Sequence, residues 1–247
     1  MGRERPAFLR MPGKGVFPLR DIWRFLAVSL IVSLLSTLFL EAGLFLSPDG
    51  YVLSVLAGKL VLFAYLLWLV QIHRKAWPAI GIAFPGRPGG WLLALAVYAV
   101  SYPLLLEATS LNESLLSHGA AWLGLTYRPA WQKVTFFIVS GYLAEPIRLV
   151  LIVFTVLPGP LIEEIAFRGV ALAALRPVQG TFWALVWTSL LFGLFHLSLA
   201  ILLPISLLGI VFGLARLLSG SLWGGLFIHC LHNALTLWLT LDAAGRL

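Results

Sequence analysis

The chain has 247 residues, of which 60% are hydrophobic and only 11% are charged, and its formal net charge is +7. This composition excludes an ordinary soluble domain, whose core would need far fewer apolar residues. We therefore expect the lipid bilayer to be its environment. The basic residues do not form a stripe with interleaved aromatic residues, so we expect no nucleic acid partner. The single cysteine, Cys230, excludes a disulfide framework within the chain and a cysteine-rich metal site.

Successive apolar runs approach the length of a membrane-spanning helix, about 20 residues each. They cover residues 22–46, 51–72, 91–110, 148–175, 181–197, 199–218 and 221–241. A backbone exposed to lipid must satisfy its own polar groups, so each run is expected to be helical. The fold class predicted is all-α, a polytopic transmembrane helical bundle of about seven spans, with roughly six to eight as the range.

The first 21 residues form a basic arm, and further basic residues lie in the connection after the second run. The residues concerned are Arg3, Arg5, Arg10, Lys14, Arg20, Arg24, Arg74, Lys75 and Arg87. Cytoplasmic flanks of membrane spans carry such an excess of Lys and Arg. We predict a multi-pass protein of the cell (plasma or inner) membrane with a cytoplasmic N-terminus. The run 22–46 is longer than a signal-peptide apolar region, so we interpret it as the first retained span.

One membrane domain is expected, with three parts: the cytoplasmic arm 1–21, the spans and connecting region 22–147, and the polar-marked helices 148–247. Residues 111–147 contain scattered charges around a short apolar stretch, and either a surface-lying helix or a short extra helix fits them. Glu41, Lys59 and Glu107 are interpreted as structural, because they lie near the ends of their runs or can extend toward the interface.

A pair of adjacent carboxylates interrupts the apolar run 148–175. Glu164 and Arg168 are four residues apart, so they share a helix face and can form an ion pair. Glu163 lies about 100° further round the helix and is free to point elsewhere. A carboxylate in a low-dielectric pocket is a candidate general base. Pro158 and Pro160 lie just upstream and are expected to bend or break the helix there.

Two further polar clusters lie in the last spans. Phe192 and His196 are four residues apart at the end of one apolar run, and His229 and Asn233 share a face of the last helix. Imidazole exchanges a proton near neutral pH, and an amide supplies hydrogen bonds without titrating. Together they could hold a water and stabilise an oxyanion. His232 lies off the shared face, so a packing role is expected for it.

The ordered set Glu-Glu-x-x-x-Arg, Phe-x-x-x-His and His-x-x-x-Asn resembles the signature of the CPBP family, the CAAX-protease and bacteriocin-processing (Abi-like) membrane proteins. The resemblance covers about residues 148–241. It implies a glutamic-type intramembrane protease in which Glu163 is the general base, His196 its partner, and His229 with Asn233 the oxyanion hole. Glu164, Arg168 and Phe192 are supporting residues. No metal or other cofactor is expected, although His196, His229 and a glutamate would also suit a zinc site with an open position.

The predicted function is an endopeptidase that hydrolyses a peptide bond of a membrane-associated protein or peptide with activated water. Its expected partners are the lipid bilayer and that substrate. Other intramembrane protease chemistries fit less well, since the chain has no His-Glu-x-x-His pair and Asp242 is the only late aspartate. The alternatives are a non-catalytic bacteriocin immunity or peptide-maturation protein that uses the same cavity for binding, and a small proton-coupled transporter.

Overall fold

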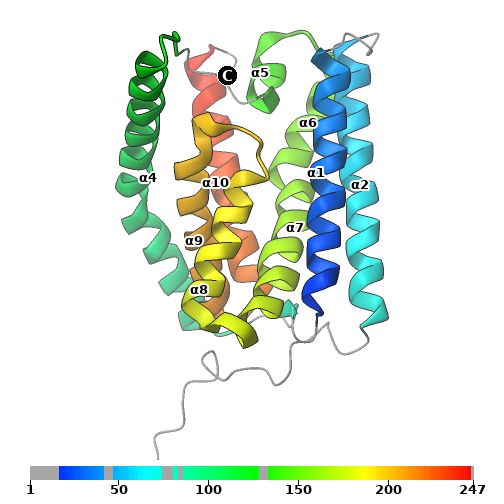
Figure 1. The fold of residues 1–247 in the computed structure, drawn as a ribbon, viewed down its shortest axis with the longest axis vertical. Coiled ribbons are helices and arrows are strands. Elements are labelled where there is room, and N and C mark those ends of the chain that lie inside the picture. Colours follow the sequence, from blue (N-terminus) through cyan, green and yellow to red (C-terminus); the bar gives the residue numbers. More distant parts are fainter. Residues whose placement is uncertain (1–16, 42–46, 74–79, 83–85, 128–132, 246–247) are drawn as a thin grey trace, which may run out of the picture.

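The computed structural model describes residues 17–41, 47–73, 80–82, 86–127 and 133–245, and the regular elements in these ranges are all helical. They are α1 Leu19–Glu41, α2 Pro48–Ile72, α4 Pro88–Trp122, α5 Lys133–Ser140, α6 Glu145–Val156, α7 Pro158–Glu164, the π-helix η2 Ile165–Ala171, α8 Leu172–Leu194, the 3-10 turn η3 Leu199–Ile201, α9 Leu202–Ser219 and α10 Leu222–Ala243. The predicted all-α bundle is confirmed (Figure 1). The basic residues of segments 1–16 and 74–79 lie outside the described residues.

Within the described residues, each of the seven predicted apolar runs falls mainly on helix, and residues 42–46 of the first run lie outside the described residues. By length and composition, four helical segments of the described chain can cross a membrane: Pro48–Ile72, Pro88–Trp122, Glu145–Leu194 and Leu199–Ser219. The third of these contains a reversal at Gly180, whose φ of 79° is readily accessible only to glycine. Figure 1 shows α6 and α7 running toward one end of the bundle and α8 returning from it. The chain is an integral membrane protein.

The predicted third span was too short. It was expected at 91–110, but α4 continues to Trp122, and the connecting region after it contains the eight-residue helix α5. Hydropathy marks where a helix contacts lipid, whereas the helix itself continues through polar residues such as Asn112 and Glu113. It ends where Gly124 adopts a positive φ of 70°.

The helices form a bundle with α10 in a central position. α1 and α2 pair along one side, α4 lies on the opposite side against α9, and α10 contacts α4, α6, α7, α9 and η2 (Figure 1). A single large core joins buried side chains from α1, α2, α4, η2, α8, α9 and α10. Large apolar side chains such as Val100 and Trp122 face outward, as a lipid environment favours.

Charge is distributed unevenly between the two ends of the bundle, although the ion pair of Arg148 with Glu145 places one arginine at the carboxylate-rich end. The end where α1 begins holds the basic residues Arg20, Arg24, Arg87, Arg176 and Arg216. The opposite end holds the carboxylates Asp49, Glu113, Glu145 and Asp242. Among the described residues, Asp21 is the one carboxylate at the basic end, where it contacts His73 and Arg24.

Candidate active site

The two adjacent glutamates lie just after a break in the helix. α6 ends at Val156, Leu157 adopts φ −127°, and α7 starts at Pro158, so the predicted break before the pair is present. α7 ends at Glu164 and passes directly into the π-helix Ile165–Ala171. π-Helical turns are rare in proteins, and those that occur are often found at functional sites. No feature of the sequence predicted this one.

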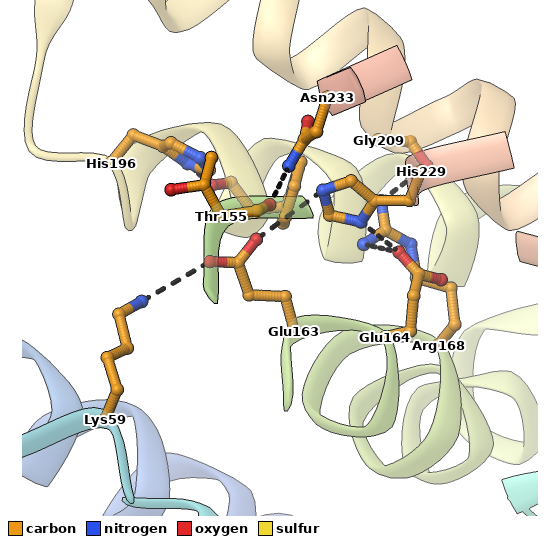
Figure 2. Close-up of polar contacts among 10 residues, drawn as sticks. Lys59, Thr155, Glu163, Glu164, Arg168, His196, Gly209, His229 and Asn233 are labelled. Atoms are coloured by element: carbon orange, nitrogen blue, oxygen red, sulfur yellow. Dashed lines mark hydrogen bonds and ion pairs between the residues drawn. The ribbon is translucent and has the colours of Figure 1, made fainter. Parts of the chain in front are cut away.

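Glu164 is the centre of a fully buried polar network. Its Oε1 lies 2.9 Å from Arg168 Nη1 and 3.0 Å from His229 Nδ1, and Arg168 Nη2 donates to the Gly209 carbonyl at 3.0 Å (Figure 2). The exposed fractions of the three side chains are 0%, 2% and 4%. The pair predicted from the four-residue spacing is therefore present, and it also fixes the orientation of the His229 ring.

Aromatic rings enclose this network. Phe212 stacks on the His229 ring with centroids 4.3 Å apart, and Phe192 meets the same ring edge-on at 5.7 Å. The Arg168 guanidinium carbon lies 4.3 Å from the Phe192 centroid, in cation–π geometry. Phe192 thus supports Arg168 and His229 together, whereas Phe212 is a site residue that the sequence analysis missed. An isolated Phe in an apolar helix carries no signal of such a role.

Gly225 of α10 leaves room for the Glu164 carboxylate, because it has no side chain. A Cβ at this position would lie 2.7 Å from Glu164 Oε2 and 3.0 Å from the Phe212 carbonyl oxygen. Such distances are shorter than van der Waals contact, so only glycine fits without a shift. The absence of a side chain here allows α10 to approach α9 and η2 closely, which brings His229 within hydrogen-bonding distance of Glu164.

Glu163 points away from Glu164, as the helix geometry predicted, and lies between two other polar groups. Its Oε1 is 3.4 Å from Lys59 Nζ, and its Oε2 is 3.8 Å from His229 Nε2 (Figure 2). The Glu163 carboxylate also interacts electrostatically with His196. Its side chain is 20% exposed while that of Glu164 is fully buried, so Glu163 is the accessible member of the pair.

The expected placement of Lys59, near the end of its run or extending to the interface, was wrong. Lys59 lies midway along α2, not at its end, and its ammonium group contacts Glu163 instead of extending to the interface. The signal was present, because Lys59 is the one formal charge between Asp49 and Arg74. A lone charge in the middle of a span is costly and usually has a partner inside the bundle.

His196 lies beside this network without a direct hydrogen bond to it. The ring follows the C-terminus of α8, and its Nδ1 is 2.8 Å from the Phe192 carbonyl oxygen. The carbonyl can only accept, so Nδ1 carries the proton and Nε2 is left for another partner. Leu197, the next residue, has a positive φ of 49°, which is strained for a leucine.

Asn112 of α4 anchors the segment that follows His196. Its amide nitrogen donates to the carbonyls of Leu199 and Ala200 at 2.9 and 2.8 Å, and its carbonyl oxygen accepts from Leu203 N at 3.2 Å. Asn112 is buried, so these bonds satisfy a group that would otherwise be costly there. They provide a structural basis for holding the strained turn at Leu197 in place.

Asn233 connects α10 to the helix break. Its amide nitrogen donates to the Thr155 carbonyl at 2.9 Å (Figure 2). Thr155 lies in the last turn of α6, where the backbone carbonyls have no N–H donor within the helix. His232, as predicted, lies in a separate contact, with its Nδ1 3.1 Å from the hydroxyl of Tyr98.

The structure therefore joins four of the predicted residues, Glu163, Glu164, Arg168 and His229, and holds His196 and Asn233 beside them through backbone bonds. Within the described ranges, no group of three or more His, Cys, Asp or Glu side chains is arranged to hold a metal ion. The expectation of a metal-free site stays a prediction. The apolar surroundings favour strong interactions among these charges.

Comparison with known proteins covers the part of the chain that contains these residues. Residues 145–235 match the family model described as type II CAAX prenyl endopeptidase Rce1-like. A Bacillus subtilis (strain 168) protein named "Putative membrane peptidase YdiL" is 29% identical over 98 residues, which are 40% of this chain and 40% of that protein. No solved structure matches the chain.

Proposed function

We propose that this chain, which resembles type II CAAX prenyl endopeptidases of the Rce1-like family over residues 145–235, is an intramembrane endopeptidase acting on a membrane-associated protein or peptide. The observation that carries the proposal is the position of Glu163. Its carboxylate is accessible, is held by a cation, and faces an oriented histidine inside a helical bundle. A carboxylate with no catalytic task would not need this arrangement at such a cost.

The 3.8 Å between Glu163 Oε2 and His229 Nε2 exceeds a direct hydrogen bond but allows one water molecule to bond to both atoms. In the proposed reaction Glu163 accepts a proton from this water, and the resulting hydroxide attacks the peptide carbonyl carbon. The carbonyl π electrons move to oxygen. Glu163 then gives its proton to the departing amide nitrogen as the C–N bond breaks, which yields a carboxylic acid and an amine.

His229 is proposed to stabilise the oxyanion. Glu164 accepts the Nδ1–H of its ring, so the remaining nitrogen, Nε2, faces the reacting groups. The two carboxylates of the site are balanced by the cations Lys59 and Arg168, each in contact with one of them. A proton added to His229 would therefore give the site a net positive charge, which favours a developing negative charge on the substrate.

His196 and Asn233 are proposed to complete the site. The Nε2 of His196 is free for the water or the substrate because Nδ1 is used by the Phe192 carbonyl. The Asn233 amide has a second N–H besides the one that Thr155 accepts, and this N–H is available to a substrate carbonyl. Both groups would act through hydrogen bonds that need no proton transfer of their own.

The cytoplasmic N-terminus is also part of the proposal. The basic end of the bundle contains the start of α1, and cytoplasmic loops carry the excess of Lys and Arg in membrane proteins. We place that end at the cytoplasmic face of the cell membrane. Cysteine accessibility labelling at Arg20→Cys and Asp242→Cys, in a Cys230→Ala background, would report the two ends separately.

The activity is tested with purified protein in liposomes. The probes are a farnesylated CAAX peptide and an unprenylated peptide with a single hydrophobic anchor, and mass spectrometry detects new termini. We expect cleavage of one of them, and a loss of about 10²-fold or more in Glu163→Gln. Glu107→Gln removes a carboxylate from the exposed face of α4 and should retain full activity. Full activity of Glu163→Gln would refute the mechanism.

Two further outcomes have defined meanings. Binding of a peptide without cleavage, in wild type and Glu163→Gln alike, would favour an immunity or maturation role over proteolysis. Activity that is lost on chelation and restored by added zinc would assign a metal role to the site. We expect activity to be unaffected by a chelator.

A further inference from the structure

A second polar cluster lies at the basic end of the bundle, and one of its members, Arg216, lies near Glu164 of the candidate active site. A cavity of about 270 Å³ is lined there by three arginines, Arg87, Arg176 and Arg216, and by the turn that contains Ser219 and Gly220. This volume far exceeds the roughly 10–15 Å³ that a single water needs. Among the described residues, no carboxylate lines it.

The three arginines come from separate elements. Arg87 precedes α4, Arg176 lies in α8 shortly before the reversal at Gly180, and Arg216 lies in the last turn of α9. A cation in the last turn of a helix is favoured by the helix dipole, which accounts for Arg216 alone. Convergence of three cations on one cavity carries a repulsive cost; Arg216 is repelled by Arg176 and attracted by Glu164.

The cavity is held by a hydrogen-bonded framework. The segment before α4 is fixed to the end of α9 and the start of α10 by hydrogen bonds. They include Arg87 N to Ser219 O at 2.9 Å, Leu222 N to Gly81 O at 2.6 Å, Ser221 Oγ to Gly81 O at 3.4 Å, and the Trp223 indole N–H to Ile82 O at 2.9 Å. The shape of the cavity is therefore built by tertiary structure and does not depend on side chains alone.

Arg216 is the most enclosed of the three. Its guanidinium packs against Gly81, where a Cβ would collide with it, and Gly81 has a positive φ of 76°. Its Nε is buried and has no hydrogen-bond partner within the part of the chain that the structure describes. A buried donor without an acceptor is unusual in a folded protein and indicates a missing partner.

We propose that this cavity binds a phosphate group, carried by an anionic phospholipid at the membrane surface. Guanidinium groups bind phosphate oxygens in pairs, and a phosphate would offset the repulsion among the arginines. Basic pockets between transmembrane helices are known sites for phosphorylated headgroups. The start of α4, whose N-cap residue makes no side-chain hydrogen bond, adds the positive end of a long helix.

The test is native mass spectrometry of the full chain in a neutral detergent, with phosphatidylglycerol or phosphatidylcholine added. We expect phosphatidylglycerol to bind at least tenfold more tightly, and Arg176→Gln/Arg216→Gln to lose this preference. Arg20→Gln/Arg24→Gln is the matched control, because it removes two exposed charges from the same end outside the cavity. Arg216→Lys keeps the positive charge but loses the planar guanidinium with its paired donors, and it should retain part of the preference for phosphatidylglycerol.

Titrating inorganic phosphate into protein with bound phosphatidylglycerol distinguishes a lipid headgroup from free phosphate as the ligand. Thermal unfolding of the two double arginine variants checks that both are folded. Displacement of the lipid by millimolar phosphate would assign the site to the free anion. If phosphate does not displace the lipid, the site is assigned to the lipid. Equal loss of lipid preference in the cavity variant and the control would overturn the proposal, as would equal binding of the two lipids to wild type. None of these measurements depends on proteolysis.

Discussion

Substitution of Gly225 by alanine tests the close packing on which the candidate active site depends. The added methyl would lie 2.7 Å from Glu164 Oε2 and 3.0 Å from the Phe212 carbonyl. Glu164 cannot move away freely, because Arg168 and His229 hold its other oxygen at 2.9 and 3.0 Å. Either α10 separates from α9 or Glu164 loses one of these bonds, and both outcomes disturb His229.

The magnitude follows from these contacts. Overpacking costs about 1–3 kcal/mol and loss of a charge-assisted hydrogen bond about 1.5–3 kcal/mol, while replacing a helical glycine by alanine returns about 1 kcal/mol. If both costs apply, the net loss is roughly 1.5–5 kcal/mol. Gly119→Ala is the matched control, because that position is in α4 and a Cβ there meets nothing within 4 Å. It should gain up to about 1 kcal/mol.

Thermal unfolding in detergent, followed by the fluorescence of the ten tryptophans, measures the difference. For a chain of this size the two variants should differ in Tm by on the order of 10 °C. Cleavage of the reporter peptide should fall in Gly225→Ala and stay unchanged in Gly119→Ala. If both variants unfold and cleave like wild type, the close approach of α10 to Glu164 does not exist in the membrane.

Three further sets of substitutions test other contacts. Lys59→Met should lower kcat up to about 10²-fold by releasing Glu163, with Lys59→Arg retaining more activity; equal rates in the three proteins would contradict this role. Asn112→Ala should cost about 1–3 kcal/mol and increase limited proteolysis at the start of α9, and unchanged digestion would argue against the anchoring role. Glu164→Gln and Arg168→Met should each cost about 3–5 kcal/mol, and the double variant less than their sum. Strict additivity in unfolding measurements would show that the two side chains are not coupled.

The sequence was sufficient to predict the all-α membrane fold and the family resemblance of residues 145–235, because both depend on local patterns. Long apolar runs require helices in lipid, and three short motifs in fixed order carry the resemblance. Helix periodicity also predicted the Glu164–Arg168 pair and the divergence of Glu163 from it, since residues four apart share a face. The proline-induced break before the glutamates followed from the missing backbone donors of Pro158 and Pro160.

Contacts between distant segments were decided only by the tertiary structure. Lys59 and Glu163 are 104 residues apart and belong to different helices, so no local period relates them. The same holds for Asn112 and the start of α9, and for the three arginines of the basic cavity. Hydropathy reports whether a helix is in the membrane, but not which neighbour each face meets. That choice depends on how side-chain volumes fit between helices, as Gly225 illustrates, and it determines which buried charges find partners.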